Sequence, residues 1–261
     1  MTTKLLILDS NNLYAVTYYA LKGDTSKLID SFIGHLRSII EKEQDVTHLI
    51  TCWDSAESRK RKETESYKAG RSPKPENYYN AFEPLQKRLA ESKVQLYQEQ
   101  GVEADDIIAK IVKAARKKSY QCVIVSSDKD MYQLLPDDEQ DKSVYIYSPQ
   151  KAEWFDAKNF IDKYGIKPSQ YKYVKSLMGD ASDNIQGVQG VGETTALKAI
   201  VAYGSLDGLY SSDFKQVQKR FVKALKEGKE DAYKSLNQVR FIEDFQLAKT
   251  TCAELPELFM F

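Results

Sequence analysis

The stretch Cys122-Val123-Ile124-Val125-Ser126-Ser127-Asp128-Lys129-Asp130 is an apolar run that leads directly into two aspartates. A short apolar run of this kind is typical of a buried strand in a parallel sheet. Residues 4–8 and 49–53 form similar runs, followed by Asp9 and Asp54. If the runs are parallel strands, their carboxyl ends lie at one edge of the sheet, where open α/β sheets place their sites. The sequence therefore predicts an α/β fold with carboxylates gathered at that edge.

Two further motifs add carboxylates to this predicted edge. Glu103 and Asp106 stand three apart at the start of a helix-like stretch, so they share a face, while Asp105 points about a quarter-turn away. Asp180 and Asp183 show the same spacing. One aspartate after a strand is more often a turn or cap residue, so the inference depends on the combination. The nine candidate metal ligands are Asp9, Asp54, Glu103, Asp105, Asp106, Asp128, Asp130, Asp180 and Asp183.

The chemistry of these residues indicates a particular kind of metal site. Carboxylates repel one another unless a cation holds them together, and oxygen-only ligands suit Mg²⁺ or Mn²⁺. So many acids could hold two divalent ions about 4 Å apart, an arrangement that hydrolyses phosphodiesters. Zinc is not expected, because the chain has only His35 and His48 and lacks a paired cysteine motif.

The distribution of charge is more informative than its sum. The formal net charge of zero argues against a general nucleic-acid binder. A basic stretch, however, begins at residues 59–62 and includes Tyr67, Lys68 and Arg71, which combine a ring for stacking with cations for phosphates. A solvated charged face remains an alternative on charge alone. Because residues 55–80 lack apolar periodicity, we expect them to project over the site as a helix or loop.

The remaining pattern predicts two parts of the chain. Strands are expected at 4–8, 46–53, 94–98, 121–126 and 144–147, and helices at 26–43, 81–92, 103–118, 167–177 and 193–203. We expect a core at 1–164 and a helical DNA-binding module at 165–261, with a tight hairpin at Gly187, Gly190 and Gly192. Glycines at this density can leave backbone N–H groups free to meet a phosphate.

Cellular location is predicted from what the sequence lacks. The three cysteines (Cys52, Cys122 and Cys252) are far apart and are expected to be free thiols in a reducing setting. No run approaches the roughly 18 apolar residues of a membrane helix. The N-terminus lacks the features of a secretory signal, so a cytoplasmic protein is expected.

Together these motifs resemble the flap endonuclease / 5′-nuclease family, which includes the 5′-exonuclease domain of bacterial DNA polymerase I and stand-alone phage enzymes. The resemblance implies a PIN-like (Rossmann-like) core with a mixed, mostly parallel sheet, a helical arch, and a helix-three-turn-helix that grips DNA. It implies Mg²⁺ or Mn²⁺ at the carboxylates and K⁺ in the hairpin. Val16, Gln186 and Gln189 depart from residues that are usual in the family, which bears on duplex affinity.

The resemblance also implies roles for individual residues. Those expected to act in catalysis are Asp9, Lys68, Arg71, Asp128 and Asp130. Those expected to contact DNA are Tyr67, Lys68, Arg71, Gly187, Gly190, Gly192 and Lys198.

The expected function is that of a structure-specific 5′ nuclease, with 5′-flap endonuclease and 5′-3′ exonuclease activity in replication or repair. Its expected partners are DNA flaps, nicks and free 5′ ends, and a stand-alone, phage-like monomer is expected. The alternative is a non-catalytic protein that binds branched DNA and retains the fold. A phosphatase ranks lower, because it would leave the basic stretch and the hairpin without a role.

Overall fold

A six-stranded sheet forms the centre of the computed structural model, which describes residues 3–55, 58, 67–68, 72–247, 256 and 259. The strand order is β3-β2-β1-β4-β5-β6. All neighbours pair in parallel except β6, which runs antiparallel to β5. The strands are β1 (Lys4–Asp9), β2 (His48–Cys52), β3 (Gln95–Tyr97), β4 (Gln121–Val125), β5 (Val144–Ser148) and β6 (Glu153–Phe155). The predicted mixed, mostly parallel sheet is thereby confirmed.

The two central strands bury side chains on both faces, which explains why their sequences are apolar runs without alternation. Leu5 and Ile7 of β1 pack into one core, while Leu6 and Leu8 pack into the other. Because successive side chains point to opposite faces, a single strand supplies both cores. Cys52 of β2 and Cys122 of β4 are buried as free thiols, as the sequence predicts.

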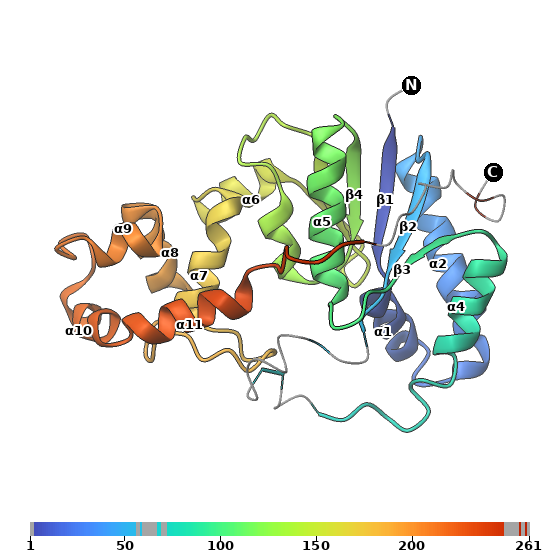
Figure 1. Ribbon diagram of the computed structural model, residues 1–261, viewed down its shortest axis with the longest axis horizontal. Coiled ribbons are helices and arrows are strands. Elements are labelled where there is room, and N and C mark those ends of the chain that lie inside the picture. Colours follow the sequence, from blue (N-terminus) through green and yellow to red (C-terminus); the bar gives the residue numbers. More distant parts are fainter. Residues whose placement is uncertain are drawn as a thin grey trace.

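Helices cover both faces of the sheet (Figure 1). The core containing Leu6 and Leu8 is closed by α1 (Ser10–Ala20), α2 (Leu28–Glu43) and α4 (Phe82–Glu91). The opposite core is closed by α5 (Ala104–Lys117), whose apolar stripe packs on the sheet. The sequence did not predict α1, β6 or α6 (Ala157–Tyr164).

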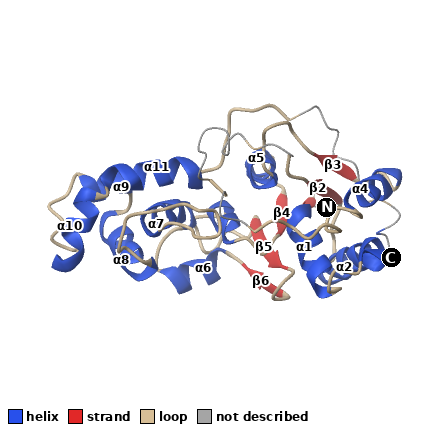
Figure 2. Ribbon diagram, turned by 90° about the horizontal axis from the view of Figure 1, so that it is seen from below, coloured by secondary structure: helices blue, strands red, loops and turns tan. Residues whose placement is uncertain are grey.

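A helical lobe extends from the α5 side of the sheet (Figures 1 and 2). Within it, α7 packs against both α8 and α11. Besides α6, its helices are α7 (Tyr171–Met178), α8 (Glu193–Tyr203), α9 (Leu206–Tyr210), α10 (Lys219–Glu227) and α11 (Lys229–Val239). Short 3₁₀ turns lie at Thr25–Lys27, Lys129–Leu134 and Pro168–Gln170.

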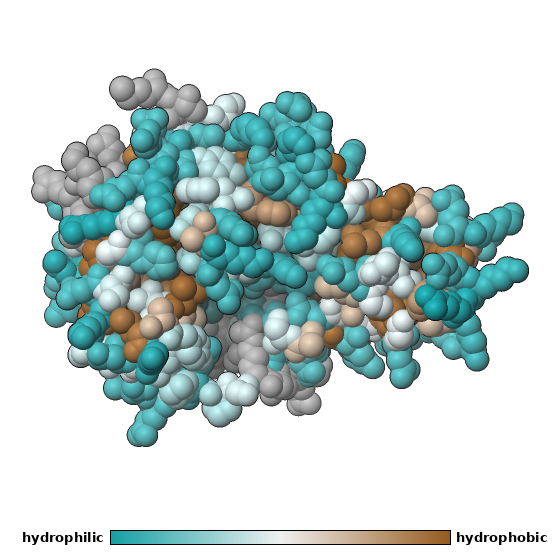
Figure 3. Space-filling model, turned by 180° about the vertical axis from the view of Figure 1, so that it is seen from behind, coloured by the Kyte–Doolittle hydropathy of each residue, from teal (hydrophilic) through white to brown (hydrophobic). Residues whose placement is uncertain are grey.

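The surface of the back face is mostly hydrophilic, with hydrophobic residues gathered in separate patches (Figure 3). Across the described ranges, no helix is long and apolar enough to cross a membrane.

The register of the central strands places the aspartates at one edge. Asp9 of β1 lies opposite Cys52 of β2, and Leu8 lies opposite Val125 of β4. Since all three strands run in the same direction, Asp9, Asp54 and the turn beginning at Ser126 leave the sheet at the same end. This is the lower end of the sheet in Figure 1, and Figure 2 views the molecule from that side.

The connection from α7 to α8 depends on a close approach of two glycines. Gly179 and Gly187 both have positive φ angles, +76° and +64°. A Cβ on Gly187 would lie 2.3 Å from the backbone nitrogen of Gly179, and one on Gly179 would lie 2.6 Å from the carbonyl oxygen of Ile185. Only residues without a Cβ fit at these two positions.

Gly187→Ala is therefore expected to destabilise the fold by about 1–3 kcal/mol or more, as overpacking does. Gly192→Ala is the matched control, because a Cβ there meets nothing within 4 Å. Thermal unfolding in EDTA measures both variants. Equal melting temperatures for the two would show that the close approach of Gly179 and Gly187 does not constrain the fold.

Candidate active site

Asp9 is held at the sheet edge by hydrogen bonds from its neighbours. Its carboxylate accepts a bond from the backbone N–H of Asn12 at 3.1 Å and another from the Ser126 hydroxyl at 2.8 Å. The first bond caps α1, because Asp9 is the N-cap residue of that helix. The second joins the end of β1 to the turn that follows β4. The side-chain oxygen of Asn12 accepts from Ser127 N–H at 3.0 Å and strengthens the same link.

Asp54 joins the end of β2 to the start of α5. Its Oδ1 accepts a hydrogen bond from the N–H of Ala104 at 2.9 Å, at the positive end of the helix. Its own backbone N–H donates to the side chain of Asn11 at 2.9 Å. Asn11 and Asn12 of α1, the helix that follows β1, thus form hydrogen bonds to the segments that follow β2 and β4. The sequence offered no signal for this role, which depends on the spatial order of the strands.

The start of α5 brings three carboxylates together. Single oxygens of Glu103, Asp105 and Asp106 all lie within 4.8 Å of one another, which is close enough for one ion. Asp105 also interacts electrostatically with Asp128 and Asp130 across the site. Asp106 is fully buried, and its Oδ1 accepts a hydrogen bond from Ile242 N–H at 2.7 Å. Asp105 is therefore close enough to the turn after β4 to affect its carboxylates, whereas Asp106 also anchors the segment that follows α11.

Asp128 and Asp130 begin the turn after β4, and a buried lysine faces them. Asp128 caps this turn by accepting from Asp130 N–H at 2.8 Å, and it remains accessible to solvent. Lys175 of α7 is only 3% exposed and bonds to the carboxylates of both Asp130 and Asp180, the latter at 2.6 Å. Because a buried ammonium is costly unless paired, these two acids explain its position. Sequence patterns do not single out Lys175, because it resembles any lysine on a helix surface.

Lys68 lies within the carboxylate cluster, as its predicted catalytic role requires. Its ammonium pairs with Glu103 at 2.8 Å, and its backbone N–H donates to the carbonyl oxygen of Asp183 at 2.8 Å. Burial lowers the pKa of Lys68, but the carboxylates of Glu103, Asp105 and Asp183 outweigh it, so its pKa is raised overall. Lys68 is thus held charged among acids.

Tyr67 differs from its expected role. The sequence suggested that its ring could stack on a base, but the residue is only 3% exposed. Its hydroxyl donates to Glu103 at 3.0 Å and lies 3.4 Å from an oxygen of Asp183. A buried ring cannot stack on DNA, so Tyr67 instead orients Glu103 in this structure. Arg71 and the basic residues 59–62 lie outside the described residues.

The electrostatics of the cluster fit a divalent cation. Burial raises the pKa of Asp9 to about 7, and the nearby charges of Asp54 and Asp128 add to the shift. Burial also raises the pKa of Asp130, with Asp128 as the second cause. These shifts mean that carboxylates which are both buried and close together do not readily carry all their negative charge without a cation. The donors are all hard oxygens, which matches Mg²⁺ or Mn²⁺.

The raised pKa of Asp9 gives a test that does not depend on activity. Below about pH 7 the folded protein holds a proton that the unfolded chain releases near its ordinary pKa of 3.8. Without metal, stability should therefore fall as pH rises from about 4 through 7. Because a ligand must be deprotonated to bind, the rise in melting temperature caused by Mg²⁺ should grow over the same range. An equal Mg²⁺-induced shift at pH 5.5 and pH 8 would contradict this explanation.

The predicted DNA-binding glycines have separate roles. The N–H of Gly187 donates to the Ser235 hydroxyl at 3.1 Å, so it is not available to a phosphate as the sequence suggested. Gly187 instead allows the close backbone packing described above. Gly190 and Gly192 are exposed, and among the described residues their N–H groups have no hydrogen-bond acceptor. They remain candidates for a phosphate contact at the start of α8.

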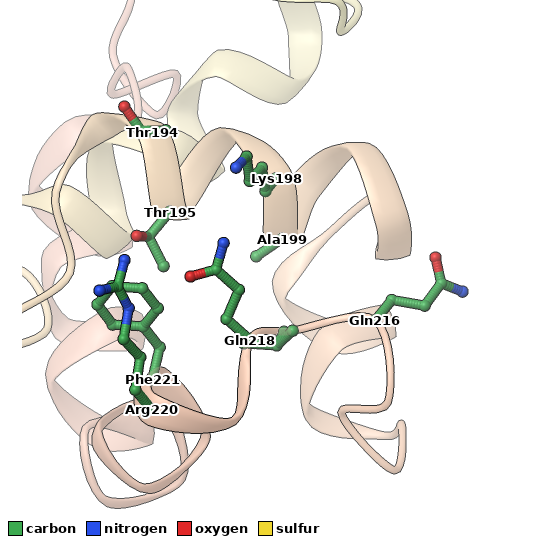
Figure 4. Close-up of a pocket in the computed structure, with 9 residues that line it drawn as sticks. Thr194, Thr195, Lys198, Ala199, Gln216, Gln218, Arg220 and Phe221 are labelled. Carbon is green, nitrogen blue, oxygen red and sulfur yellow. The ribbon is translucent and has the colours of Figure 1, made fainter.

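Lys198 lines a pocket of about 140 Å³ between α8 and the start of α10. Figure 4 shows Thr195 on α8 facing the segment that carries Gln218 and Arg220, while the side chain of Thr194 points away from that segment. Neither Lys198 nor Arg220 forms an ion pair with an acid in the part of the chain that the structure describes. Ligand pockets are usually about 300 Å³ or larger, so this one fits a phosphate group better than a nucleotide.

An α/β sheet that gathers carboxylates at one edge, with a lysine among them, is suited to the metal-dependent hydrolysis of phosphodiesters, which is the chemistry of metal-dependent nucleases. The chain matches two family models: the 5′-3′ exonuclease N-terminal resolvase-like domain over residues 4–165, and the 5′-3′ exonuclease C-terminal SAM fold over residues 166–255. The chain therefore belongs to the 5′-3′ exonuclease family, in agreement with the resemblance predicted from its motifs.

Relatives with similar sequences are bacterial polymerases. The chain is 31% identical over 260 residues to DNA polymerase I of Mycobacterium leprae, covering 95% of this chain and 28% of that protein. It is 34% identical over 221 residues to the thermostable DNA polymerase I of Thermus thermophilus, covering 79% of this chain and 25% of that protein. The chain thus spans about a quarter of the length of these relatives.

Solved structures of a phage enzyme share the fold. The bacteriophage T5 5′-exonuclease with bound zinc ions superimposes with a TM-score of 0.75 at 22% identity, covering 90% of this chain and 89% of that chain. A pseudo-enzyme-product complex of the T5 flap endonuclease with DNA and metal ions gives a TM-score of 0.74, also at 22% identity, covering 90% and 88%. These similarities confirm the predicted fold class.

Proposed function

We propose that this chain is a structure-specific 5′ nuclease that hydrolyses DNA phosphodiesters at 5′ flaps, nicks and free 5′ ends. The observation that carries the proposal is the position of Lys68, whose ammonium lies 2.8 Å from Glu103 inside the carboxylate cluster. A site for divalent cations alone would not require a lysine there. A site that also receives a scissile phosphate gains from one, because the ammonium stabilises the charge that develops on the phosphate oxygens.

The proposed metal site takes its ligands from the cluster at the sheet edge. Asp9, Asp54, Asp105 and Asp128 are not fully buried, so they are suited to reach a bound ion, and Glu103 completes the group. When bound, a pair of Mg²⁺ or Mn²⁺ ions supplies a nucleophile at neutral pH and stabilises charge during phosphodiester displacement. Since all these carboxylates come from one chain, we propose that a monomer is sufficient.

The chain's own residues position the reacting groups. Tyr67 orients Glu103, while Lys175 neutralises and fixes Asp130 and Asp180. When DNA binds, the ammonium of Lys68 leaves Glu103 and pairs with the scissile phosphate. Its positive charge is therefore present where the reaction occurs. The exposed Gly190 and Gly192 hold the DNA backbone, and the carbonyl groups of the same hairpin hold K⁺. Lys198 adds a phosphate contact beside this hairpin.

A cleavage map tests this function. Labelled 5′-flap, nicked and single-stranded substrates of one sequence are incubated with the chain and Mg²⁺. The proposal predicts products from the 5′ strand, with the flap cut near its junction faster than the single strand is cut. Absence of products from every substrate in both Mg²⁺ and Mn²⁺ would overturn it. Tight binding to the flap without products would favour the non-catalytic alternative.

A further inference from the structure

Two exposed tyrosines stand out on the surface near the candidate active site. Among the described residues, four large hydrophobic side chains are exposed: Tyr19 at 55%, Tyr79 at 58%, Trp154 at 39% and Val201 at 60%. Trp154 and Val201 lie apart in the sequence on β6 and α8, whereas Tyr19 and Tyr79 both contact the ring of the buried Tyr78. We call the group of Tyr19, Tyr78, Tyr79 and Lys74 the tyrosine platform.

The platform is held in place by α1. Tyr78 packs edge-on against Tyr14 and Tyr18, with ring centroids 5.2 and 4.8 Å apart. The hydroxyl of Tyr14 donates to the carbonyl oxygen of Tyr78. The hydroxyl of Tyr18 donates to Asn77 at 2.7 Å, and Asn77 in turn donates to the carbonyl oxygen of Gly23 at 2.9 Å. The two exposed rings therefore stand on a fixed base, which lowers the entropic cost of a ligand binding to them.

A cation accompanies the rings. Lys74 places its ammonium 4.9 Å from the centroid of Tyr78 and 5.7 Å from that of Tyr19. Within the described ranges Lys74 forms no ion pair, although the exposed Glu76 lies two residues away. Exposed aromatic rings beside an unpaired lysine are the features with which proteins bind single-stranded nucleic acid, the rings stacking on bases and the cation meeting phosphates.

The position of the platform connects it to the carboxylate cluster. Helix α1 begins immediately after Asp9, and Tyr19 lies ten residues farther on, which is about 15 Å along the helix axis. The second exposed tyrosine, Tyr79, comes eleven residues after Lys68 in the sequence. The segment from residue 72 onward runs beside α1 toward α4 (Figure 1). The platform is thus close enough to contact a DNA strand that leaves the carboxylate cluster, and too far from the cluster to take part in the reaction itself.

We propose that the tyrosine platform binds the single-stranded 5′ portion of the DNA substrate, with bases stacked on Tyr19 and Tyr79 and a phosphate held by Lys74. This inference rests on the proposed function. It assigns to Tyr19 and Tyr79 the stacking role that the buried Tyr67 cannot perform. If these tyrosines served only to cover the core, we would expect their rings to be buried, but the rings of Tyr19 and Tyr79 are more than half exposed.

The test compares binding of two 5′-flap substrates that share the same duplex, one with normal flap bases and one with abasic flap nucleotides. Binding is measured in EDTA, so no cutting is needed. The full chain should bind the normal flap at least about fivefold more tightly, which corresponds to about 1 kcal/mol, because bases stack on exposed aromatic rings and abasic nucleotides do not. The double variant Tyr19→Ala/Tyr79→Ala should lose this preference, while Tyr19→Phe, which keeps the ring, should retain it.

Matched measurements separate the possible outcomes. Val201→Ala removes an exposed hydrophobic side chain elsewhere and should leave the preference intact. A nicked duplex without a flap should bind the double variant and the unmodified chain equally. The proposal is overturned if the unmodified chain does not distinguish the two flaps, or if the double variant still does. Because binding is read without cleavage, failure of the proposed catalytic function would appear separately, as intact discrimination with no products in Mg²⁺.

Discussion

Asp128→Asn is expected to slow cleavage of a 5′-flap substrate by about 10³-fold or more. Asp128 remains accessible to solvent and interacts electrostatically with Asp9, Asp105 and Asp183. Amide nitrogen replaces one of two anionic oxygens, so the site loses both a ligand and a charge. Stabilisation by a metal ion is worth several kcal/mol, and about 4 kcal/mol corresponds to this factor.

The loss should be confined to the chemical step. Single-turnover cleavage in Mg²⁺ measures the rate, and binding in EDTA measures affinity, which should be unchanged or tighter because a repulsive charge is gone. Asp162→Asn is the matched control, since Asp162 is exposed and, among the described residues, pairs only with Lys158 on α6. If Asp128→Asn cleaves within tenfold of the unmodified chain, Asp128 is not part of the metal site.

Lys68→Ala is expected to reduce the single-turnover rate by about 10²–10³-fold, the effect of removing one donor aimed at developing charge. Lys68 is the described residue of the basic stretch whose ammonium lies within the carboxylate cluster. Lys68→Arg keeps the charge with a different shape, so it should recover part of the rate.

The control for Lys68 comes from the same exposed pair on α6. Lys158→Ala removes a surface ammonium and should leave cleavage unchanged, because exposed ion pairs contribute little. Saturating substrate distinguishes a rate effect from weakened binding. If the rate of Lys68→Ala recovers fully at high substrate concentration, Lys68 binds DNA but does not act in the chemical step.

The sequence predicted the features that depend on local patterns. The apolar strands β1, β2 and β4 and the amphipathic α5 follow from short runs and helical spacing, and the carboxylates follow from their positions at the ends of these elements. Helix α1 was missed because its buried face is formed by Leu13, Tyr14, Thr17 and Tyr18, and tyrosine and threonine give a weak helical pattern. The three-residue strand β6 is mostly exposed and has no alternation to detect.

The residues that the sequence missed in the site act through tertiary structure. Lys175 belongs to the helix Tyr171–Met178 and reaches the carboxylate cluster only because α7 packs beside the turn that carries Asp130. Asn11 and Asn12 matter because β1 lies between β2 and β4 in the sheet. The burial of Tyr67 depends on contacts with Glu103 and Asp183 that no local pattern encodes.

We propose above all that the carboxylates at the sheet edge bind divalent ions that serve DNA hydrolysis. Anomalous scattering from crystals grown with Mn²⁺ tests it most directly, because it locates each ion without reference to activity. We expect two peaks within the cluster, coordinated by Asp9, Asp128 and neighbouring carboxylates, and loss of at least one peak in Asp128→Asn. A chain that cleaves flap DNA while its Mn²⁺ peaks lie only at surface acids outside the cluster would contradict the claim.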